Sequence, residues 1–168
     1  MLDNFNSVEG FHRGRFLGFQ SVRELQRDRC MAVPQEPGVY LVLRDPAYPH
    51  CFSAISRGGH FKGKDPTVLV SRLEAHWVEQ AIVLYIGKAG GDASRQTLRA
   101  RLSCYMRFGA GKPVGHSCGR FIWQLENCHD LKVCWRPGVD HDAEALESEY
   151  IRSFTGIYGN RSFANLRN

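Results

Sequence analysis

The chain of 168 residues has 22 Lys and Arg against 17 Asp and Glu, a net charge of +5, with 43% hydrophobic and 23% charged residues. This composition is typical of a globular domain and excludes collagen, coiled coils and disordered tails. No apolar run approaches the roughly 18 residues that a membrane span needs, and the N-terminus lacks the basic-then-apolar layout of a signal peptide. We therefore expect a single domain over residues 1–168 that works in the cytoplasm.

Hydrophobic periodicity and turn residues predict a mixture of helices and strands. In chain order, the predicted elements are a helix around 21–29, a strand at 38–43, a helix that starts at Asp65-Pro66, a strand at 82–86, a helix at 96–108, a strand at 131–135 and a helix at 142–155. The segment 121–125 fits either a strand or a helix. Residues 1–36 are expected to form an N-terminal arm, and residues 44–80 an insertion between the first two strands.

The helix predicted at 96–108 carries an arginine on its apolar face. At about 100° per residue, Leu98, Leu102 and Tyr105 fall on one side of this helix. Arg101 lies within the same side, one turn from Tyr105. Its charge is therefore expected to point toward the packed interior.

The helix predicted at 142–155 carries an acid in the middle of its apolar stripe. Glu147 falls on the same side as Ala143, Tyr150 and Ile151. Burying an unpaired carboxylate costs several kcal/mol, so Glu147 requires a cation, either a metal ion or an arginine. A purely structural salt bridge to Arg101 or another arginine is the alternative to a functional site.

The positive charge is concentrated in one stretch of the chain. Between residues 88 and 123, basic side chains are opposed only by Asp92. The basic residues of this block are Lys88, Arg95, Arg99, Arg101, Arg107, Lys112 and Arg120. Such a block is expected of a surface that binds phosphates, and equally of a solvated basic face.

Six cysteines in a chain of this length are compatible with a zinc site or with disulfide bonds, but their spacing does not favour either. They are Cys30, Cys51, Cys104, Cys118, Cys128 and Cys134. No C-x-x-C pair occurs among them, and the neighbouring histidines do not complete a zinc-finger pattern. Most of the thiols are expected to be reduced and partly buried.

Five short motifs follow one another along the chain. They are Gly38-Val39-Tyr40 on the first strand, Tyr85-Ile86-Gly87-Lys88-Ala89 on the second, Arg101-Leu102-Ser103-Cys104-Tyr105 on a helix, Glu147 on a later helix and Asn165 near the C-terminus. In order and residue type they resemble the GIY-YIG nucleases, a superfamily of repair, restriction and homing endonucleases. In that family a short hairpin usually joins the signature strands, whereas here 44 residues separate Tyr40 from Tyr85.

The resemblance implies an α+β fold in which helices flank a small central three-stranded antiparallel sheet, with the site on one face of the sheet. It also implies a divalent-metal-dependent endonuclease that hydrolyses DNA phosphodiester bonds with one Mg²⁺ or Mn²⁺ ion per site, in a repair or a restriction and defence role. The catalytic residues it implies are Tyr40, Tyr85, Lys88, Arg101, Glu147 and Asn165. Asn165 would tie the terminal loop to the site through its amide.

The residue types suit this chemistry. Glu147 would hold the metal ion, because Mg²⁺ and Mn²⁺ prefer oxygen ligands. Arg101 would grip the scissile phosphate through its planar guanidinium group. Tyr40 would orient or deprotonate the attacking water, with Tyr85 and Lys88 beside it. Since a free phenol has a pKa near 10, a tyrosine base requires a nearby cation, Lys88 or the metal, that lowers its pKa.

Further residues are expected to contact DNA. They are Lys62, Lys64, Arg99, Tyr105, Arg107, Lys112, His116 and Arg120. Lys62 and Lys64 belong to a basic loop of the insertion, which either contacts the DNA backbone or has no function. His116 and Arg120 are either phosphate contacts or ordinary loop and packing residues.

Two other functions remain open. A catalytically silent nucleic-acid-binding module would keep the same fold and basic face, although the complete set of motif residues argues against it. A structural zinc or redox protein is disfavoured by the cysteine spacing.

Overall fold

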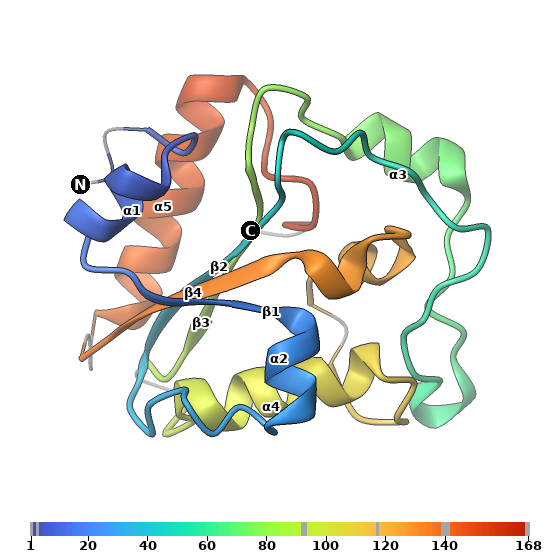
Figure 1. The fold of residues 1–168 in the computed structure, drawn as a ribbon, viewed down its shortest axis with the longest axis horizontal. Helices are drawn as coiled ribbons and strands as arrows, with labels where there is room; N and C mark the ends of the chain where they lie inside the picture. Colours follow the sequence, from blue (N-terminus) through green and yellow to red (C-terminus); the bar gives the residue numbers. More distant parts are fainter. Residues whose placement is uncertain (1, 3, 92–93, 117, 139–141, 167–168) are drawn as a thin grey trace.

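The computed structural model describes residues 2, 4–91, 94–116, 118–138 and 142–166. Asp92, the acid within the basic block, lies outside the described residues. The chain folds as an α+β structure with a four-stranded antiparallel sheet (Figure 1). The strands are β1 (Leu17–Ser21), β2 (Gly38–Leu43), β3 (Val83–Ala89) and β4 (Lys132–Pro137). The helices are α1 (Val8–Arg13), α2 (Val22–Arg27), α3 (Val70–His76), α4 (Leu98–Gly109) and α5 (Ala143–Tyr158), with short 3-10 turns η1 (Phe61–Gly63), η2 (Arg120–Gln124) and η3 (Cys128–Asp130).

The sheet has the strand order β1-β4-β2-β3, so β3 forms one of its edges. Helices α1 and α5 lie together on one face, and α2 and α4 lie on the other (Figure 1). Every residue of β2 is buried, because alternate side chains enter the core on each face. Tyr40 and Val42 belong to the core beneath α4, and Leu41 belongs to the core beneath α5.

The prediction of three strands was wrong, because the segment expected to be an N-terminal arm contains β1. Gly18 and Phe19 have φ angles of 92° and 53°, and the register of β1 against β4 shifts between Leu17 and Gln20. This irregularity breaks the alternation of apolar and polar residues by which a strand is recognised. Phe11 and Phe16 of the same segment are fully buried, so this segment contributes side chains to the core.

Most other elements lie where the sequence predicts them. The strand expected at 38–43 has the same bounds in the structure, and the one expected at 82–86 continues to Ala89. The strand expected at 131–135 corresponds to β4, and the helices expected at 21–29, 96–108 and 142–155 correspond to α2, α4 and α5. The ambiguous segment 121–125 is neither strand nor α-helix but contributes to the 3-10 turn η2.

The helix expected to start at Asp65-Pro66 begins several residues later, at Val70. The Asp65 carboxylate accepts a hydrogen bond from the Thr67 backbone N–H, a local turn that competes with helix formation. The Val68 N–H then donates to the side-chain oxygen of Gln124. These bonds fix a non-helical entry to α3.

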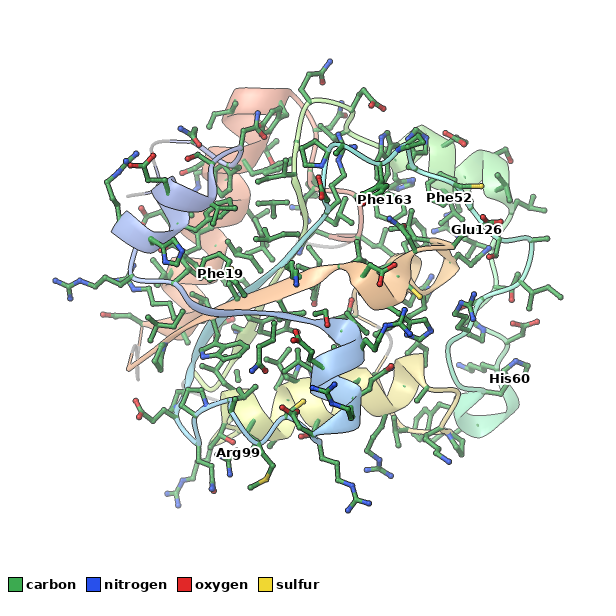
Figure 2. The ribbon with its side chains drawn as sticks, viewed as in Figure 1. Phe19, Phe52, His60, Arg99, Glu126 and Phe163 are labelled. Carbon is green, nitrogen blue, oxygen red and sulfur yellow. The ribbon has the colours of Figure 1, made fainter. Side chains whose placement is uncertain are left out.

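The insertion between β2 and β3 packs onto the C-terminal segment of the chain. The ring of Phe52 stacks on Phe163 with a centroid distance of 5.6 Å, and Trp77 meets Phe163 edge-on at 5.2 Å. Phe52 and Phe163 lie side by side in Figure 2. The insertion thus packs on the residue that stands two positions before Asn165 and supports the terminal segment.

All six cysteines are free, and Cys30, Cys128 and Cys134 are buried. Burial raises the pKa of the Cys30 thiol to about 11, so this thiol is an inert core group. Within the described ranges, no helix is long and apolar enough to cross a membrane.

Candidate active site

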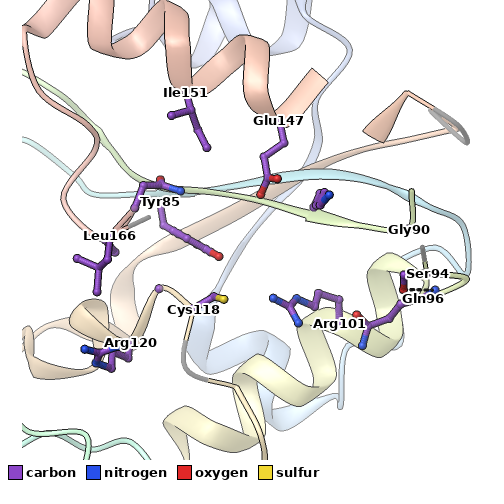
Figure 3. Close-up of a pocket in the computed structure, with 14 residues that line it drawn as sticks. Tyr85, Gly90, Ser94, Gln96, Arg101, Cys118, Arg120, Glu147, Ile151 and Leu166 are labelled. Atoms are coloured by element: carbon purple, nitrogen blue, oxygen red, sulfur yellow. Dashed lines mark hydrogen bonds between the residues drawn. The ribbon is translucent and has the colours of Figure 1, made fainter. Parts of the chain in front are cut away.

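A pocket of about 420 Å³ lies beside the β3 edge, between α4 and α5 (Figure 3). Among the residues that line it are those expected to be catalytic: Tyr85, Lys88, Arg101, Glu147 and Asn165. Tyr40 is absent from the lining. The fold therefore brings together residues from two helices, one strand and the C-terminal segment.

The two charged residues at the centre come from opposite faces of the sheet. Arg101 lies on α4, whose start is fixed by the Thr97 hydroxyl accepting a hydrogen bond from the Ala100 N–H. Glu147 lies on α5, which covers the other face. Because β3 is an edge strand, both helices can reach past it. The Glu147 side chain extends into the pocket from α5, and the Arg101 side chain extends into it from α4, toward Cys118 (Figure 3). The Tyr85 hydroxyl points into the space between them.

Glu147 is half-buried and lies at the margin of the apolar stripe rather than at its centre. Leu146 and Ile151 beside it are also half-buried, while Tyr150 and Phe154 are buried. Burial raises the pKa of the Glu147 carboxyl, although the charges of Lys88 and Arg101 act in the opposite direction. Within the described ranges no cation lies within 4.0 Å of this carboxylate, so the alternative of a structural salt bridge to Arg101 is not realised.

The raised pKa of Glu147 has a consequence for stability. A carboxyl with a raised pKa in the folded state stabilises the protein below its unfolded pKa, and this contribution is lost as pH rises through the folded value. In metal-free buffer we expect Glu147→Gln to match the wild type in free energy of unfolding near pH 4 and to exceed it at pH 7. Urea titrations across this range measure the difference. An advantage of the variant that is constant with pH would contradict the assignment.

Lys88 has a partner other than the one expected. It was predicted to lie beside the tyrosines and lower a phenol pKa, but its Nζ lies 3.0 Å from a carboxylate oxygen of Glu144. The cation that acts on Tyr40 and Tyr85 is Arg101. Lys88 still lines the pocket and contributes positive charge near Glu147.

Tyr40, Tyr85 and Tyr105 form a cluster of rings beside Arg101. The centroid distances are 5.9 Å for Tyr40 and Tyr85, 6.4 Å for Tyr40 and Tyr105, and 5.8 Å for Tyr85 and Tyr105. Burial raises the pKa of Tyr40 to about 12 in spite of the nearby charge of Arg101. The charge of Arg101 thus lowers the pKa of Tyr40 as a nearby cation should, but burial outweighs it. The buried Tyr40 hydroxyl has no hydrogen-bond partner of ordinary geometry among the described residues.

Two glycines make room for these rings. Gly87 lies opposite Tyr40 in the β2–β3 ladder, and a Cβ at Gly87 would lie 2.4 Å from Cζ of Tyr40. Gly119 has a φ of 69°, and a Cβ there would lie 2.5 Å from the Tyr105 hydroxyl, which donates a hydrogen bond of 2.7 Å to the Gly119 carbonyl. The motif glycine Gly87 thus serves ring packing, a role that the sequence pattern did not indicate.

Asn165 joins the C-terminal segment to the free edge of β3. Its Nδ2 donates to the Ile86 carbonyl at 2.8 Å, and its Oδ1 accepts from the Ile86 N–H at 2.8 Å. The Ser162 hydroxyl also donates to this oxygen. The side-chain amide therefore pairs with the backbone of the edge strand β3 as a neighbouring strand would, and it holds the terminal segment at the site.

Three of the residues expected to contact DNA have internal roles. Tyr105 is fully buried, and His116 is 3% exposed and stacks on it at 4.4 Å. Burial, together with the charge of Arg101, lowers the pKa of His116 to about 3, so the ring is neutral and hidden from phosphates. Arg99 donates hydrogen bonds to the carbonyls of Val33 and Met31 and holds the N-terminal segment against α4.

The other expected DNA contacts lie on the surface or in the pocket wall. Lys62, Lys64, Arg107 and Lys112 are exposed, and Arg120 lines the pocket. The insertion loop packs against the C-terminal end of α4, where the Gly59 N–H donates to the Phe108 carbonyl, and against the following loop, whose Lys112 carbonyl leaves no room for a Cβ at Gly59. These lysines and Arg107 therefore belong to neighbouring segments near the C-terminal end of α4.

The pocket also contains residues that the sequence did not single out. Cys118 lies at its wall and points toward Arg101 (Figure 3), and Ile151 lies one turn after Glu147. Glu147 with water is compatible with a single hard cation, because among the described residues its half-buried carboxylate faces the pocket with no cation within 4.0 Å. In the described part of the chain, no group of three or more His, Cys, Asp or Glu side chains could hold a metal ion.

Comparisons of the chain with family models, curated proteins and solved structures find no match. Its function is therefore inferred from the geometry of the pocket and from the motif resemblance.

Proposed function

We propose that this protein is a divalent-metal-dependent DNA endonuclease of the GIY-YIG type. The observation that supports this most is the meeting of Arg101 and Glu147 in one pocket from opposite faces of the sheet. Tyr85 and Asn165 line the same pocket, so four of the five motifs converge. Within the four strands, β4, β2 and β3 would correspond to the three-stranded sheet of the family, with β1 added at the far edge.

Each lining residue has a distinct role in this proposal. Arg101 remains protonated at physiological pH and offers a planar fork of N–H donors to the oxygens of a phosphodiester. Glu147 would hold Mg²⁺ or Mn²⁺, which when bound supplies positive charge for the phosphoryl oxygens and a water of lowered pKa. Burial raises the pKa of Tyr85 well above its ordinary value, so its hydroxyl stays protonated and orients a water or phosphate oxygen by hydrogen bonding.

The position of Tyr40 favours a second candidate function, a nucleic-acid-binding module without catalysis. Its hydroxyl is buried, lies outside the pocket lining and has a pKa of about 12. A residue in this state cannot serve as a solvent-exposed base. In the endonuclease proposal, Tyr40 therefore supports Tyr85 and Arg101 instead of activating water itself.

A cleavage assay distinguishes the two functions. Wild-type protein is incubated with supercoiled, branched and single-stranded DNA in Mg²⁺ or Mn²⁺. We expect cleavage of at least one substrate, and a rate at least about a hundredfold lower for Arg101→Ala, the scale of losing a key electrostatic stabiliser. Arg101→Lys should recover only part of the rate, because it restores the charge without the planar fork.

Arg27→Ala is the matched control, since Arg27 is an exposed arginine on α2. Cleavage by Arg101→Ala at the wild-type rate would refute the site assignment. If the wild type binds DNA but leaves all three substrates intact with both metals, the binding module replaces the endonuclease as the function.

A further inference from the structure

A second hollow, of about 590 Å³, lies on the outer side of α5. It is lined by Ser148, Ile151, Arg152, Thr155, Gly156 and Arg161. Ile151 also lines the active-site pocket, so the two cavities adjoin. No residue of the hollow belongs to the motifs or to the predicted DNA contacts.

The hollow has an excess of positive charge that the protein does not compensate. None of its lining residues is acidic. Among the described residues neither Arg152 nor Arg161 has a salt bridge, and Nη1 of Arg161 is covered from solvent without a hydrogen-bond acceptor. Glu144, one turn before Ser148, is already paired with Lys88. Arg152 is exposed, so an anion in the hollow can accept charge-assisted hydrogen bonds from its guanidinium group, and it would offset the positive charge of both arginines.

The spacing along α5 matches that of a nucleic-acid strand. Glu147, Ile151 and Thr155 lie on successive turns of the helix, and two turns correspond to about 11 Å. One strand of a duplex advances about 3.4 Å per nucleotide. By this axial spacing, a strand whose scissile phosphate lies in the active-site pocket would present another phosphate at the hollow about three nucleotides away.

We propose that this hollow is a second phosphate subsite for the nucleic-acid strand that enters the active-site pocket. Arg161 and Arg152 supply the charge, and the Ser148 hydroxyl can add a hydrogen bond. The subsite rests on the proposed function, because its ligand is the continuation of the cleaved strand. Its role is to set the register of that strand rather than to take part in bond cleavage.

Binding measured without cleavage tests the subsite. The Glu147→Gln protein is titrated with a fluorescent duplex of about 16 base pairs, and with the matching single strand, at several salt concentrations. Adding Arg161→Ala or Arg152→Ala should weaken binding about fivefold to tenfold and reduce the slope of log K against log salt by about 0.7 to 0.9 for each lost contact. Arg161→Lys should retain the slope, and Arg27→Ala should change neither quantity.

The outcomes separate this proposal from the endonuclease itself. A reduced slope for Arg161→Ala together with an uncleaved substrate for the wild type would support the subsite and refute the nuclease. An unchanged slope for both arginine variants, checked against folded protein by circular dichroism, would overturn the subsite. It would also be overturned if Arg161→Ala abolished binding of inorganic phosphate while DNA binding kept its wild-type slope, because the hollow would then hold free phosphate only.

Discussion

The Glu147→Gln variant should cleave supercoiled plasmid at least about a hundredfold more slowly than the wild type in Mg²⁺ or Mn²⁺. Glu147 shares the pocket with Arg101, and among the described residues no cation lies within 4.0 Å of its carboxylate. Glutamine has nearly the same shape but lacks the charge that a hard cation requires. The variant should be at least as stable at pH 7, since burial raises the pKa of the carboxyl that it removes.

Glu149→Gln is the matched control for this prediction. Glu149 lies on the same helix, carries the same charge and does not line the pocket. Rates are compared by the disappearance of supercoiled DNA over time, with thermal unfolding of each protein measured in parallel. Equal rates for Glu147→Gln and the wild type would remove Glu147 from the site, whereas an equal loss in both variants would indicate a general electrostatic effect.

The Gly87→Ala variant should lose about 3 kcal/mol of unfolding free energy, the upper part of the usual range for overpacking a core. The new methyl carbon would lie 2.4 Å from Cζ and 2.6 Å from the hydroxyl of Tyr40, whose ring is fully buried and has no free space to enter. The expected fall in Tm is roughly 6–12 °C for a domain of this size. Calorimetry or urea unfolding measures it.

Gly156→Ala adds the same methyl group but should raise the free energy of unfolding instead of lowering it. Gly156 lies within α5, and a Cβ there would meet nothing within 4 Å, so alanine should stabilise the helix by about 0.5–1 kcal/mol. The cost of Gly87→Ala should also shrink in a Tyr40→Leu background, because the two positions are in contact. A cost that is the same in both backgrounds would show that Tyr40 is not the obstacle.

The elements that carry the site could be predicted because their patterns are local. The run 38–43 combines valine, tyrosine and leucine after a glycine, and the structure has a strand with these bounds. The 3.6-residue periodicity of α4 and α5 placed Arg101 and Glu147 on inward-facing sides, and both line the pocket. By contrast, β1 was missed because Gly18 and Phe19 interrupt its alternation.

Partners and burial could not be predicted, because they depend on distances between elements. Whether Lys88 contacts a tyrosine or Glu144 depends on how α5 crosses β3. In the structure, Lys88 forms an ion pair with Glu144. His116 follows an exposed glycine-rich loop, but its own ring is buried and stacks on Tyr105, which the sequence does not indicate. Burial then outweighs the charge of Arg101 at Tyr40 and leaves the pKa of that phenol high.

The sequence by itself determined the α+β class, the main helices and strands and the candidate residues, because helix and strand periodicities are properties of neighbouring residues. Only the tertiary structure decided which of them share a pocket. The edge position of β3 lets α4 and α5 bring Arg101 and Glu147 together, and it leaves Tyr40 beneath Gly87 in the core. These outcomes follow from the strand order and helix packing, which no local pattern encodes.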